Sequence, residues 1–240
     1  MQQTLAVALT GLQMDADRLD RIALNLANAS TPAYRRQVAG LQRTSAPQFA
    51  SQVEVGLTHR AGATTVSDTR AGTLRATGQS LQLALAGQEF FEVATNSGPA
   101  YTRNGDFRLD TRGRLVTASG NAVMGRGGEI VLTSPNPTID AAGVIRDGAN
   151  IVGQLKLVTF TDPKSLRRLG DGLWAPGEGM TLLPDTSQSV RQGYLENSNV
   201  SPLVEMLQLV ETMRHFESLQ RMTQAYDDMV GQAIRKLGEG

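Results

Sequence analysis

The first segment of the chain carries apolar side chains at a strict seven-residue repeat, and this repeat constrains the fold more than any other feature. Spacings of four and three residues alternate, as in a helix that packs along its length against another helix. Such a repeat favours left-handed coiled-coil packing. Pro32 disfavours helical geometry in the residue before it, so the predicted helix stops near Asn28 to Thr31. The repeat positions are Leu5, Leu9, Leu12, Ala16, Leu19, Ala23 and Leu26.

A second, longer helix is predicted at the C-terminal end. Ser201 can cap it, Pro202 fits its first turn, and Glu205 lies near the positive end of its dipole. An apolar stripe continues to Leu237, which corresponds to about 50 Å of helix. That is much longer than a typical globular helix. The apolar residues predicted to form its seam are Leu203, Met206, Leu207, Val210, Met213 and Phe216.

The residues between the helices predict an antiparallel β domain. Leu81, Leu83 and Leu85 alternate with other residues, and short strand-sized pieces follow, separated by turn signals. The pair Asn104-Gly105 is typical of a type I′ hairpin. We expect a small sandwich or an irregular barrel. The predicted parts are a helix at 1–33, an extended connector at 34–80, the β domain at 81–190 and a helical end at 191–240.

The fold class is therefore predicted as α+β, with the two helical ends pairing as a coiled-coil-like domain. The C-terminal helix is too long to lie wholly on a small β domain, so we expect both seams to be covered by each other and by other chains. The alternative is that the first helix is an ordinary surface helix on the core of its own domain, because globular helices also use these positions.

Nothing in the sequence predicts an enzyme. The charges balance at a formal net charge of zero, which gives no indication of nucleic acid binding. Cysteine is absent, and His59 and His215 have no partners at ligand spacing, so no metal or other cofactor is expected. Gly125 to Gly128 has the composition of a turn, and the pair Arg167-Arg168 is interpreted as solvated surface. No catalytic set is found.

The first apolar run lacks a basic leader, so no cleavable signal peptide is expected. No apolar stretch is long enough to span a membrane, and no direct membrane insertion is expected.

Two polar motifs flank the helices. The first lies where the N-terminal helix ends and contains Asn25, Leu26, Ala27, Asn28, Thr31 and Tyr34. Its Asn, Ser and Thr side chains can bond their own backbone and stop the helix. A plain helix stop does not explain why so much polarity lies at one end of a seam. The second motif precedes the C-terminal helix and contains Gly193, Tyr194, Leu195, Glu196, Ser198, Asn199 and Val200.

Both motifs resemble the signatures of the axial proteins of the bacterial flagellum, and within them the basal-body rod proteins. The segment from Tyr101 to Phe107 resembles the β domain that rod and hook proteins share. One departure is Ala33, where the family usually has Gly. The short connector and the segment Arg214 to Glu217 look most like the proximal-rod members, with the distal-rod members as runner-up.

The resemblance implies a structural subunit of the periplasmic rod that assembles with copies of itself and with neighbouring rod proteins. It also implies departure through the flagellar type III export apparatus. The seam residues would then carry assembly, and Asn25, Asn28, Asn197 and Asn199 would hold helix ends and subunit register. Two other classes stay open from the residues alone. One is a periplasmic cell-wall hydrolase docked by its helical ends, and the other is a fibre subunit of a phage tail or adhesin.

Overall fold

The computed structural model describes residues 2–40, 65–163, 166–176, 179–182 and 190–238. The chain divides into two compact units. The helical unit comprises residues 1–27, 37–68 and 200–240, and the β unit comprises residues 28–36 and 69–199. Each unit is therefore assembled from segments that lie far apart in the sequence. Residues 41–64 of the predicted connector, including His59, lie outside the described residues.

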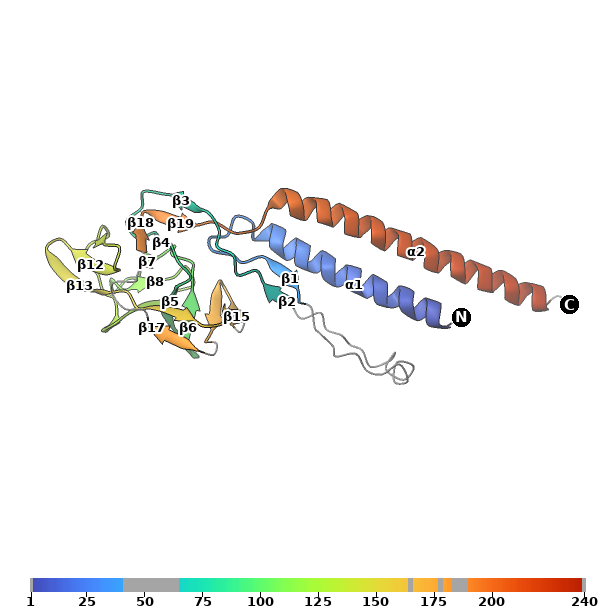
Figure 1. The fold of residues 1–240 in the computed structure, drawn as a ribbon, viewed down its shortest axis with the longest axis horizontal. Coiled ribbons are helices and arrows are strands. Elements are labelled where there is room, and N and C mark those ends of the chain that lie inside the picture. The colour runs from blue at the N-terminus through green and yellow to red at the C-terminus, as the bar shows by residue number, and fades with distance from the viewer. Residues whose placement is uncertain (1, 41–64, 164–165, 177–178, 183–189, 239–240) are drawn as a thin grey trace. The chain divides into compact units, whose positions relative to one another are not determined.

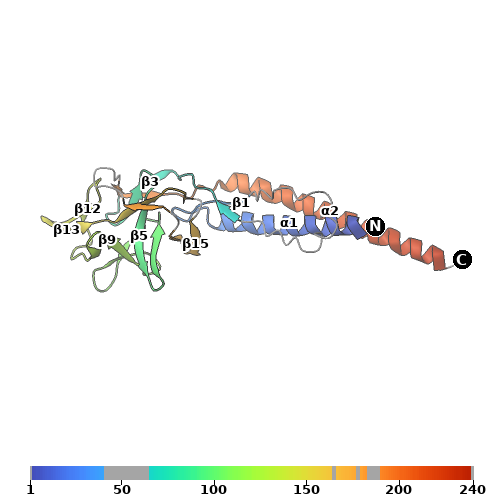
Figure 2. The ribbon, with the colours of Figure 1, turned by 60° about the horizontal axis from the view of Figure 1, so that its bottom comes forward.

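The helical unit contains α1 (Gln2–Ala27) and α2 (Pro202–Gly238), which lie side by side and antiparallel (Figures 1 and 2). Asn25 of α1 contacts Glu205 of α2, and Asp15 contacts His215. Between these two contacts the residue number falls by ten along α1 and rises by ten along α2, as expected for antiparallel helices. β1 (Gln37–Ala39) and β2 (Thr65–Ser67) pair beside the helices as a short antiparallel ribbon. The predicted helix ends are confirmed, because α1 stops at Ala27 and α2 starts at Pro202.

The predicted coiled-coil pairing is wrong. The side of α1 with the most deeply buried residues carries Ala8, Asp15, Ile22 and Asn25, and none of these belongs to the predicted seam. On α2 the fully buried residues are Glu205 and Thr212, which are polar. The two helices therefore meet through a mixed, partly polar surface. Most of the predicted seam of α2 is exposed instead, because the helix presents a different face to α1 than the apolar count suggests.

The β unit is built almost entirely from antiparallel pairs. Its main sheet has ten strands in an open path from β15 through β16, β6, β5, β9 and β8 to β7, with β10, β14 and β17 attached. The sheet forms a half-barrel, in place of the predicted sandwich or irregular barrel. The α+β class thus holds only in part. The main-sheet strands are β5 (Phe90–Thr95), β6 (Gly98–Thr102), β7 (Arg108–Leu109), β8 (Leu115–Val116), β9 (Ala122–Gly125), β10 (Gly128–Glu129), β14 (Leu157–Phe160), β15 (Arg167–Gly170), β16 (Leu173–Ala175) and β17 (Met180–Leu182).

Three smaller sheets complete the β unit. One has three strands, and each of the others pairs an early strand with a late one, so that residues near 75 and 84 lie beside residues near 195 and 191. These pairs tie the C-terminal motif to the start of the β unit. The strands are β11 (Thr138–Ile139), β12 (Val144–Asp147) and β13 (Asn150–Gln154) in the first sheet, β4 (Leu83–Leu85) with β18 (Val190–Gln192), and β3 (Leu74–Ala76) with β19 (Tyr194–Glu196).

Alternation along β5 divides the core of the β unit in two. Phe91 and Val93 point into the larger apolar cluster, whereas Phe90 belongs to a second cluster with Tyr101 and Phe160. The rings in the second cluster meet edge to face, with centroids 5.5 Å apart for Phe90 and Phe160 and 5.0 Å apart for Tyr101 and Phe160. Successive strand residues point to opposite faces of a sheet, so one strand can serve both clusters.

A five-residue turn that begins with Asp occurs twice, between β7 and β8 and between β11 and β12. The Asp110 carboxylate accepts hydrogen bonds from the backbone N–H groups of Arg112 and Arg114. The Asp140 carboxylate accepts from Ala142 and Val144 in the same positions. The glycine three residues after each aspartate, Gly113 or Gly143, has a positive φ. A short acceptor side chain and a residue that tolerates this φ are what the turn requires.

The type I′ hairpin predicted at Asn104-Gly105 is wrong. A type I′ turn needs positive φ at both central residues, and neither residue has it. The Asn104 side chain instead accepts a hydrogen bond from the Asp106 N–H. Any Cβ at position 105 would overlap the Leu83 carbonyl oxygen. This glycine therefore serves the close approach of two backbones and not a hairpin.

Candidate functional site

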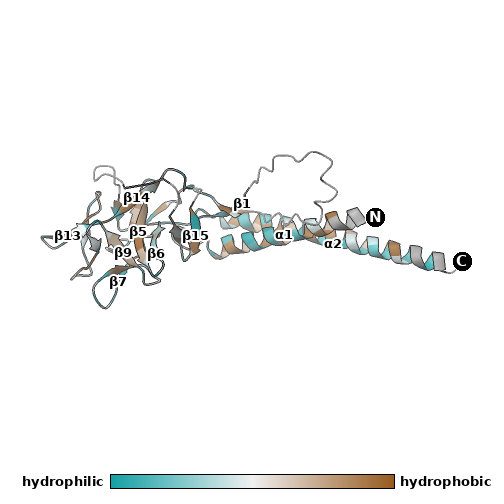
Figure 3. Ribbon diagram, turned by 90° about the horizontal axis from the view of Figure 1, so that it is seen from below, coloured by the Kyte–Doolittle hydropathy of each residue, from teal (hydrophilic) through white to brown (hydrophobic). Residues whose placement is uncertain are grey.

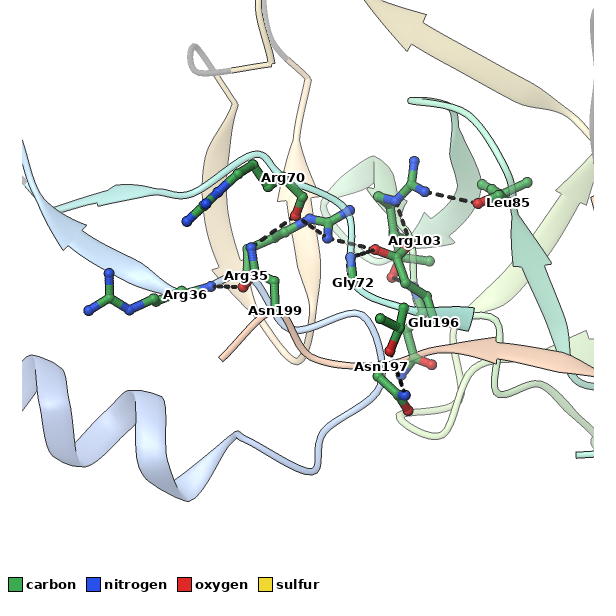
Figure 4. A network of polar contacts seen from close by, with 12 residues as sticks. Arg35, Arg36, Arg70, Gly72, Leu85, Arg103, Glu196, Asn197 and Asn199 are labelled. Carbon is green, nitrogen blue, oxygen red and sulfur yellow. Dashed lines mark hydrogen bonds and ion pairs between the residues drawn. The ribbon is translucent and has the colours of Figure 1, made fainter. Parts of the chain in front are cut away.

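The segment that ends the first polar motif lies beside the second motif within the β unit, and Figure 4 shows Arg35 and Arg36 next to Glu196 and Asn199. The Ala33 N–H donates to the Glu196 carbonyl over 2.8 Å, and the Asn199 N–H donates to the Tyr34 carbonyl over 3.2 Å. The Arg36 N–H donates to Oδ1 of Asn199 over 2.6 Å. Residues 33–36 therefore run along the strand that leads to α2, although more than 150 positions of sequence separate them.

A third segment covers the other edge of the C-terminal motif. β19 pairs with β3, and the Asn197 N–H donates to the Thr73 carbonyl over 2.8 Å. The Gly72 N–H donates to Oε1 of Glu196 over 2.9 Å. A Cβ at Gly72 would overlap the Asn197 carbonyl, so only glycine lets the two backbones approach this closely. Three distant segments thus converge on Glu196.

The Glu196 carboxylate is 1% exposed and lies between two guanidinium groups. Nη1 of Arg35 is 2.6 Å from Oε1, and Nε of Arg103 is 2.8 Å from Oε2. Arg103 also donates to the backbone carbonyls of Leu85 and Glu89. Ionised hydrogen bonds of this kind are short and strong, and removing one partner of a buried ion pair is strongly destabilising. The geometry defines a structural junction.

Arg168 supports the same junction from the β15–β16 hairpin. Its guanidinium lies over the rings of Tyr34 and Trp174, with distances of 4.5 and 5.2 Å to the ring centroids. It also donates to the Arg35 carbonyl over 2.8 Å. A planar guanidinium between two aromatic faces gains cation–π attraction from both. Residues 34 and 35 are therefore tied to the sheet by a side chain that we interpreted from sequence as solvated surface, and that interpretation is wrong.

Ala33 occupies a backbone conformation that suits glycine. Its φ is +56°, inside the left-handed region, and the residue is buried. A residue with a Cβ is strained there by roughly 1–2 kcal/mol. The turn geometry is thus retained despite the departure from glycine. Its N–H bond to Glu196 and the neighbouring arginine contacts hold the strained residue in place.

In the helical unit, Asn25 joins α1 to β1 and to α2. Its side-chain amide accepts from the Gln37 N–H over 2.8 Å and donates to the Gln37 carbonyl over 2.9 Å. Its Nδ2 also lies 3.3 Å from Oε2 of Glu205, which is fully buried. Asn25 was predicted to hold the helix end, and it bonds to the backbone of the strand that follows.

Further along the helix pair, Asp15 contacts His215, with 2.5 Å between Oδ2 and Nδ1. Farther still, Gly11 lies against the Leu219 side chain, and a Cβ at position 11 would stand 3.0 Å from Leu219 Cδ1. Thr212 is buried, and its hydroxyl bonds to the Gln208 carbonyl of its own helix. Paired polar groups at a helix contact specify register better than apolar ones do.

Five predicted seam residues of α2 form an exposed apolar face. They have exposed fractions between 49% and 69%, with Leu203 at 69% and Leu207 at 64%. We call this set the α2 apolar face. Figure 3, in which the ribbon is coloured by hydropathy, shows apolar and polar residues alternating along both helices. The set is Leu203, Met206, Leu207, Val210 and Met213.

The other predicted seam residues differ in their exposure to solvent. Leu9, Ala16 and Ala23 are exposed, whereas Leu12, Leu19, Leu26 and Phe216 are half-buried. The Leu5 side chain lies outside what the structure describes.

The remaining motif residues lie where they can shape the chain locally. Asn28 and Thr31 bond to each other in the turn after α1, through backbone and side chain. Leu195 and Val200 are buried, Tyr194 and Ser198 are half-buried, and Ala27 is exposed. Gly193 has a φ of +76° at the turn between β18 and β19. Sequence reasoning included Arg103 in the β-domain resemblance but missed its contact with Glu196, because nothing local marks two residues 93 positions apart as partners.

In the described ranges, no group of three or more acidic or histidine side chains is placed to hold a metal ion. Neither α1 nor α2, as described, is long and apolar enough to cross a membrane. An exposed apolar helix face and a β unit in which parts of both motifs are tied together are features of a structural assembly subunit.

Two family models match the chain. Residues 84–149 match the D1 domain of flagellar hook protein FlgE/F/G, and residues 191–236 match the C-terminal region of flagellar basal body rod FlgEFG proteins. The flagellar basal-body rod protein FlgF of Caulobacter vibrioides is 30% identical over 100% of this chain and 99% of its own length. FlgF of Mesorhizobium japonicum is 32% identical over 99% of both chains. FlgG of Buchnera aphidicola from Acyrthosiphon pisum is 30% identical over 96% of this chain and 98% of its own.

The chain belongs to the family of flagellar basal-body rod proteins. It is a structural subunit located in the flagellar basal body, and it assembles with itself and with other rod components. The sequence predicted likeness first to the proximal-rod members, which are the FlgF proteins, and next to the distal-rod members, which are the FlgG proteins, and this likeness is confirmed.

Proposed function

We propose that the chain enters the rod by laying the α2 apolar face against helices of neighbouring copies and of other rod proteins. Its five residues are large, and each is at least 49% exposed in the single chain. Burial of one such side chain contributes roughly 1.5–3 kcal/mol. Leu9 and Leu24 of α1 are also about half exposed and can extend the contact.

The polar pairs between α1 and α2 support this division of surfaces. The polar side chains at the contact between the two helices pair within the chain, as Asn25 does with Glu205 and Asp15 with His215. The apolar groups are left for other chains, where hydrophobic burial is the main driving force. Assembly through the ends would use residues 1–33 and 191–240, joined by the connector at 34–80 to a β domain at 81–190 that faces outward.

We further propose that the assembled helices enclose the export channel and transmit torque, and that the chain reaches the rod through the flagellar type III export apparatus. We also propose that it does so without catalysing a reaction. Membership in the rod protein family supports the proposals on the export channel and on torque. The lack of a recognisable catalytic motif in the sequence supports the proposal that the chain catalyses no reaction.

A photo-crosslinking amino acid at position 210 tests the assembly surface. Val210 lies in the α2 apolar face and is 49% exposed, so the probe itself does not disturb a buried contact. In purified basal bodies we expect covalent products with a second copy or with another rod protein. The matched control is the same variant irradiated as a dilute purified chain, where no such product should form. Intact rods that contain the probe but give no product would disprove the surface.

A further inference from the structure

The chain passes between the helical unit and the β unit four times, at positions 27/28, 36/37, 68/69 and 199/200. These covalent crossings are the chain segments along which a force on one unit reaches the other. A subunit under load therefore needs the crossing segments to keep fixed positions relative to one another within the β unit. A polar network within the β unit joins three of them.

Asn199 bridges the crossings directly. Its N–H and Oδ1 bond to the Tyr34 carbonyl and the Arg36 N–H, next to the crossing at 36/37. Its Nδ2 donates to the Arg70 carbonyl over 2.9 Å, next to the crossing at 68/69. Asn199 is itself the last residue before the crossing at 199/200. One side chain thus links three crossings.

Glu196 anchors the same segments to the body of the sheet. Its carboxylate binds Arg35 and the Gly72 N–H, which lie just inside two of the crossings. On its other side it binds Arg103, whose guanidinium is held by the carbonyls of Leu85 and Glu89. The path from the crossings to the sheet is therefore a chain of short, buried, directional contacts (Figure 4).

We propose that Glu196 and Asn199 form a clamp that positions the crossing segments and keeps them in register when the subunit carries load. The inference rests on the proposed torque-transmitting function. Packing alone would hold the segments together but would resist sliding weakly, because the hydrophobic effect is not directional. Hydrogen bonds weaken steeply when their angles change, so the clamp resists relative motion of the segments.

The first test is amide hydrogen exchange on the purified full chain carrying Glu196→Gln. The substitution keeps the side-chain shape but removes the charge that binds two guanidinium groups and the Gly72 N–H. We expect exchange at Gly72 to become about tenfold faster or more, since charge-assisted hydrogen bonds are worth at least that factor. Exchange in β5 and β9 should change much less.

Glu92→Gln is the matched control. Glu92 is buried and pairs with Lys156 over 2.7 Å, and this ion pair includes none of the crossing segments. Asn199→Ala is the second variant, used because loss of a buried charge at 196 can prevent folding. It leaves the ion pairs of Glu196 in place and should speed exchange at Arg36. Unchanged exchange at Gly72 and Arg36, or equal acceleration by Glu92→Gln, would overturn the clamp.

The second test measures swimming speed against medium viscosity in cells that carry Asn199→Ala or Glu92→Gln as the only copy. Incorporation into purified basal bodies is scored in parallel. We expect Asn199→Ala rods to form but to lose speed more steeply with load than Glu92→Gln rods. Equal load curves with normal incorporation would overturn the mechanical role while leaving the assembly function intact. Failure of the proposed function itself would show separately, as missing crosslinks from position 210 in the otherwise unchanged chain.

Discussion

The two units of this chain differ in the composition of their interiors and in the apolar residues that they leave exposed. The β unit encloses Phe91, Val93 and Leu157 at 0% exposure and keeps most of its charges outside or paired. The helical unit encloses Glu205 and Thr212 at 0% exposure, while Leu203 and Leu207 remain more than 60% exposed. The β unit therefore has an apolar core of its own, whereas α2 of the helical unit leaves large apolar side chains exposed.

This difference suits a chain whose β unit has an apolar core of its own and whose helices present apolar side chains to other chains. Most helix stability in proteins comes from packing of an apolar face. In the helical unit the α2 apolar face is exposed among the described residues, and polar pairs such as Asp15 with His215 hold the helices in register. On the assembly proposed above, most of the stability of the helical ends would come from contacts with other chains.

The largest expected effect is the difference in stability between substituting a buried leucine of the β unit and an exposed leucine of α2. Leu157→Asp places a charge in the core of the β unit, where an unpaired buried charge costs far more than the usual net stability of a domain. We expect the purified chain to lose its β structure, measured by circular dichroism. Leu207→Asp should leave that spectrum and the unfolding midpoint nearly unchanged, because the side chain is 64% exposed.

In the cell, substitutions on the helices should act on assembly and not on folding. Leu207→Asp should abolish incorporation into basal bodies and hence swimming, although the protein is folded. Leu12→Asp, at a half-buried position of α1, should have the same result. Normal motility of the Leu207→Asp strain would show that the apolar face is not the assembly surface and would remove the contrast between the units.

A smaller effect is expected at the one strained alanine of the junction. Ala33→Gly removes the Cβ that opposes a φ of +56°. The gain of roughly 1–2 kcal/mol is partly offset by about 0.5–1 kcal/mol of extra freedom in the unfolded chain. We predict that the free energy of unfolding of the β unit rises by about 0.5–1 kcal/mol, measured by urea denaturation. Gly72→Ala, where a Cβ meets the Asn197 carbonyl, should instead destabilise it.

The smallest effect concerns a surface carboxylate of the β unit. Hydrogen bonds from the Thr133 hydroxyl, and then from the Thr133 and Ser134 N–H groups, hold the pKa of Asp147 below its ordinary value of 3.8, against the opposing effect of desolvation. A lowered folded-state pKa stabilises the protein above the ordinary value, and the contribution is lost as the pH falls through the folded-state value.

Unfolding midpoints measured from about pH 5 down to about pH 2.5 test this sign. The difference in stability between wild type and Asp147→Asn should shrink as the pH falls. A constant difference would show that the charge of Asp147 has no part in its contacts with Thr133 and Ser134.

Local signals in the sequence predicted the helix ends well. Pro32 and the Asn28 to Thr31 cluster mark the end of α1, and Ser201-Pro202 marks the start of α2. These signals depend on neighbours within a few residues. Asn104-Gly105 failed as a hairpin signal because its glycine is required by the distant Leu83 carbonyl. Arg168 failed as a surface residue because Tyr34 and Trp174 reach it from other segments.

The predicted apolar seams of the two helices show the same limit of local signals over longer distances in the sequence. Counting apolar residues correctly selected Leu12, Leu19 and Leu26 for the half-buried side of α1. It could not detect that Asp15 would find His215 and Asn25 would find Glu205, 180 positions or more away. Once such polar partners exist, the helices turn those faces inward and leave Leu9, Leu203 and Leu207 outside.

The sequence by itself determined the two helices, the β-rich middle and the family to which the chain belongs, because periodicity and short motifs are written in neighbouring residues. The tertiary structure alone decided which helix faces meet and which segments converge on Glu196. Those choices depend on pairing polar groups that are far apart along the chain, and the free energy of burying such groups is favourable only when their partners arrive together.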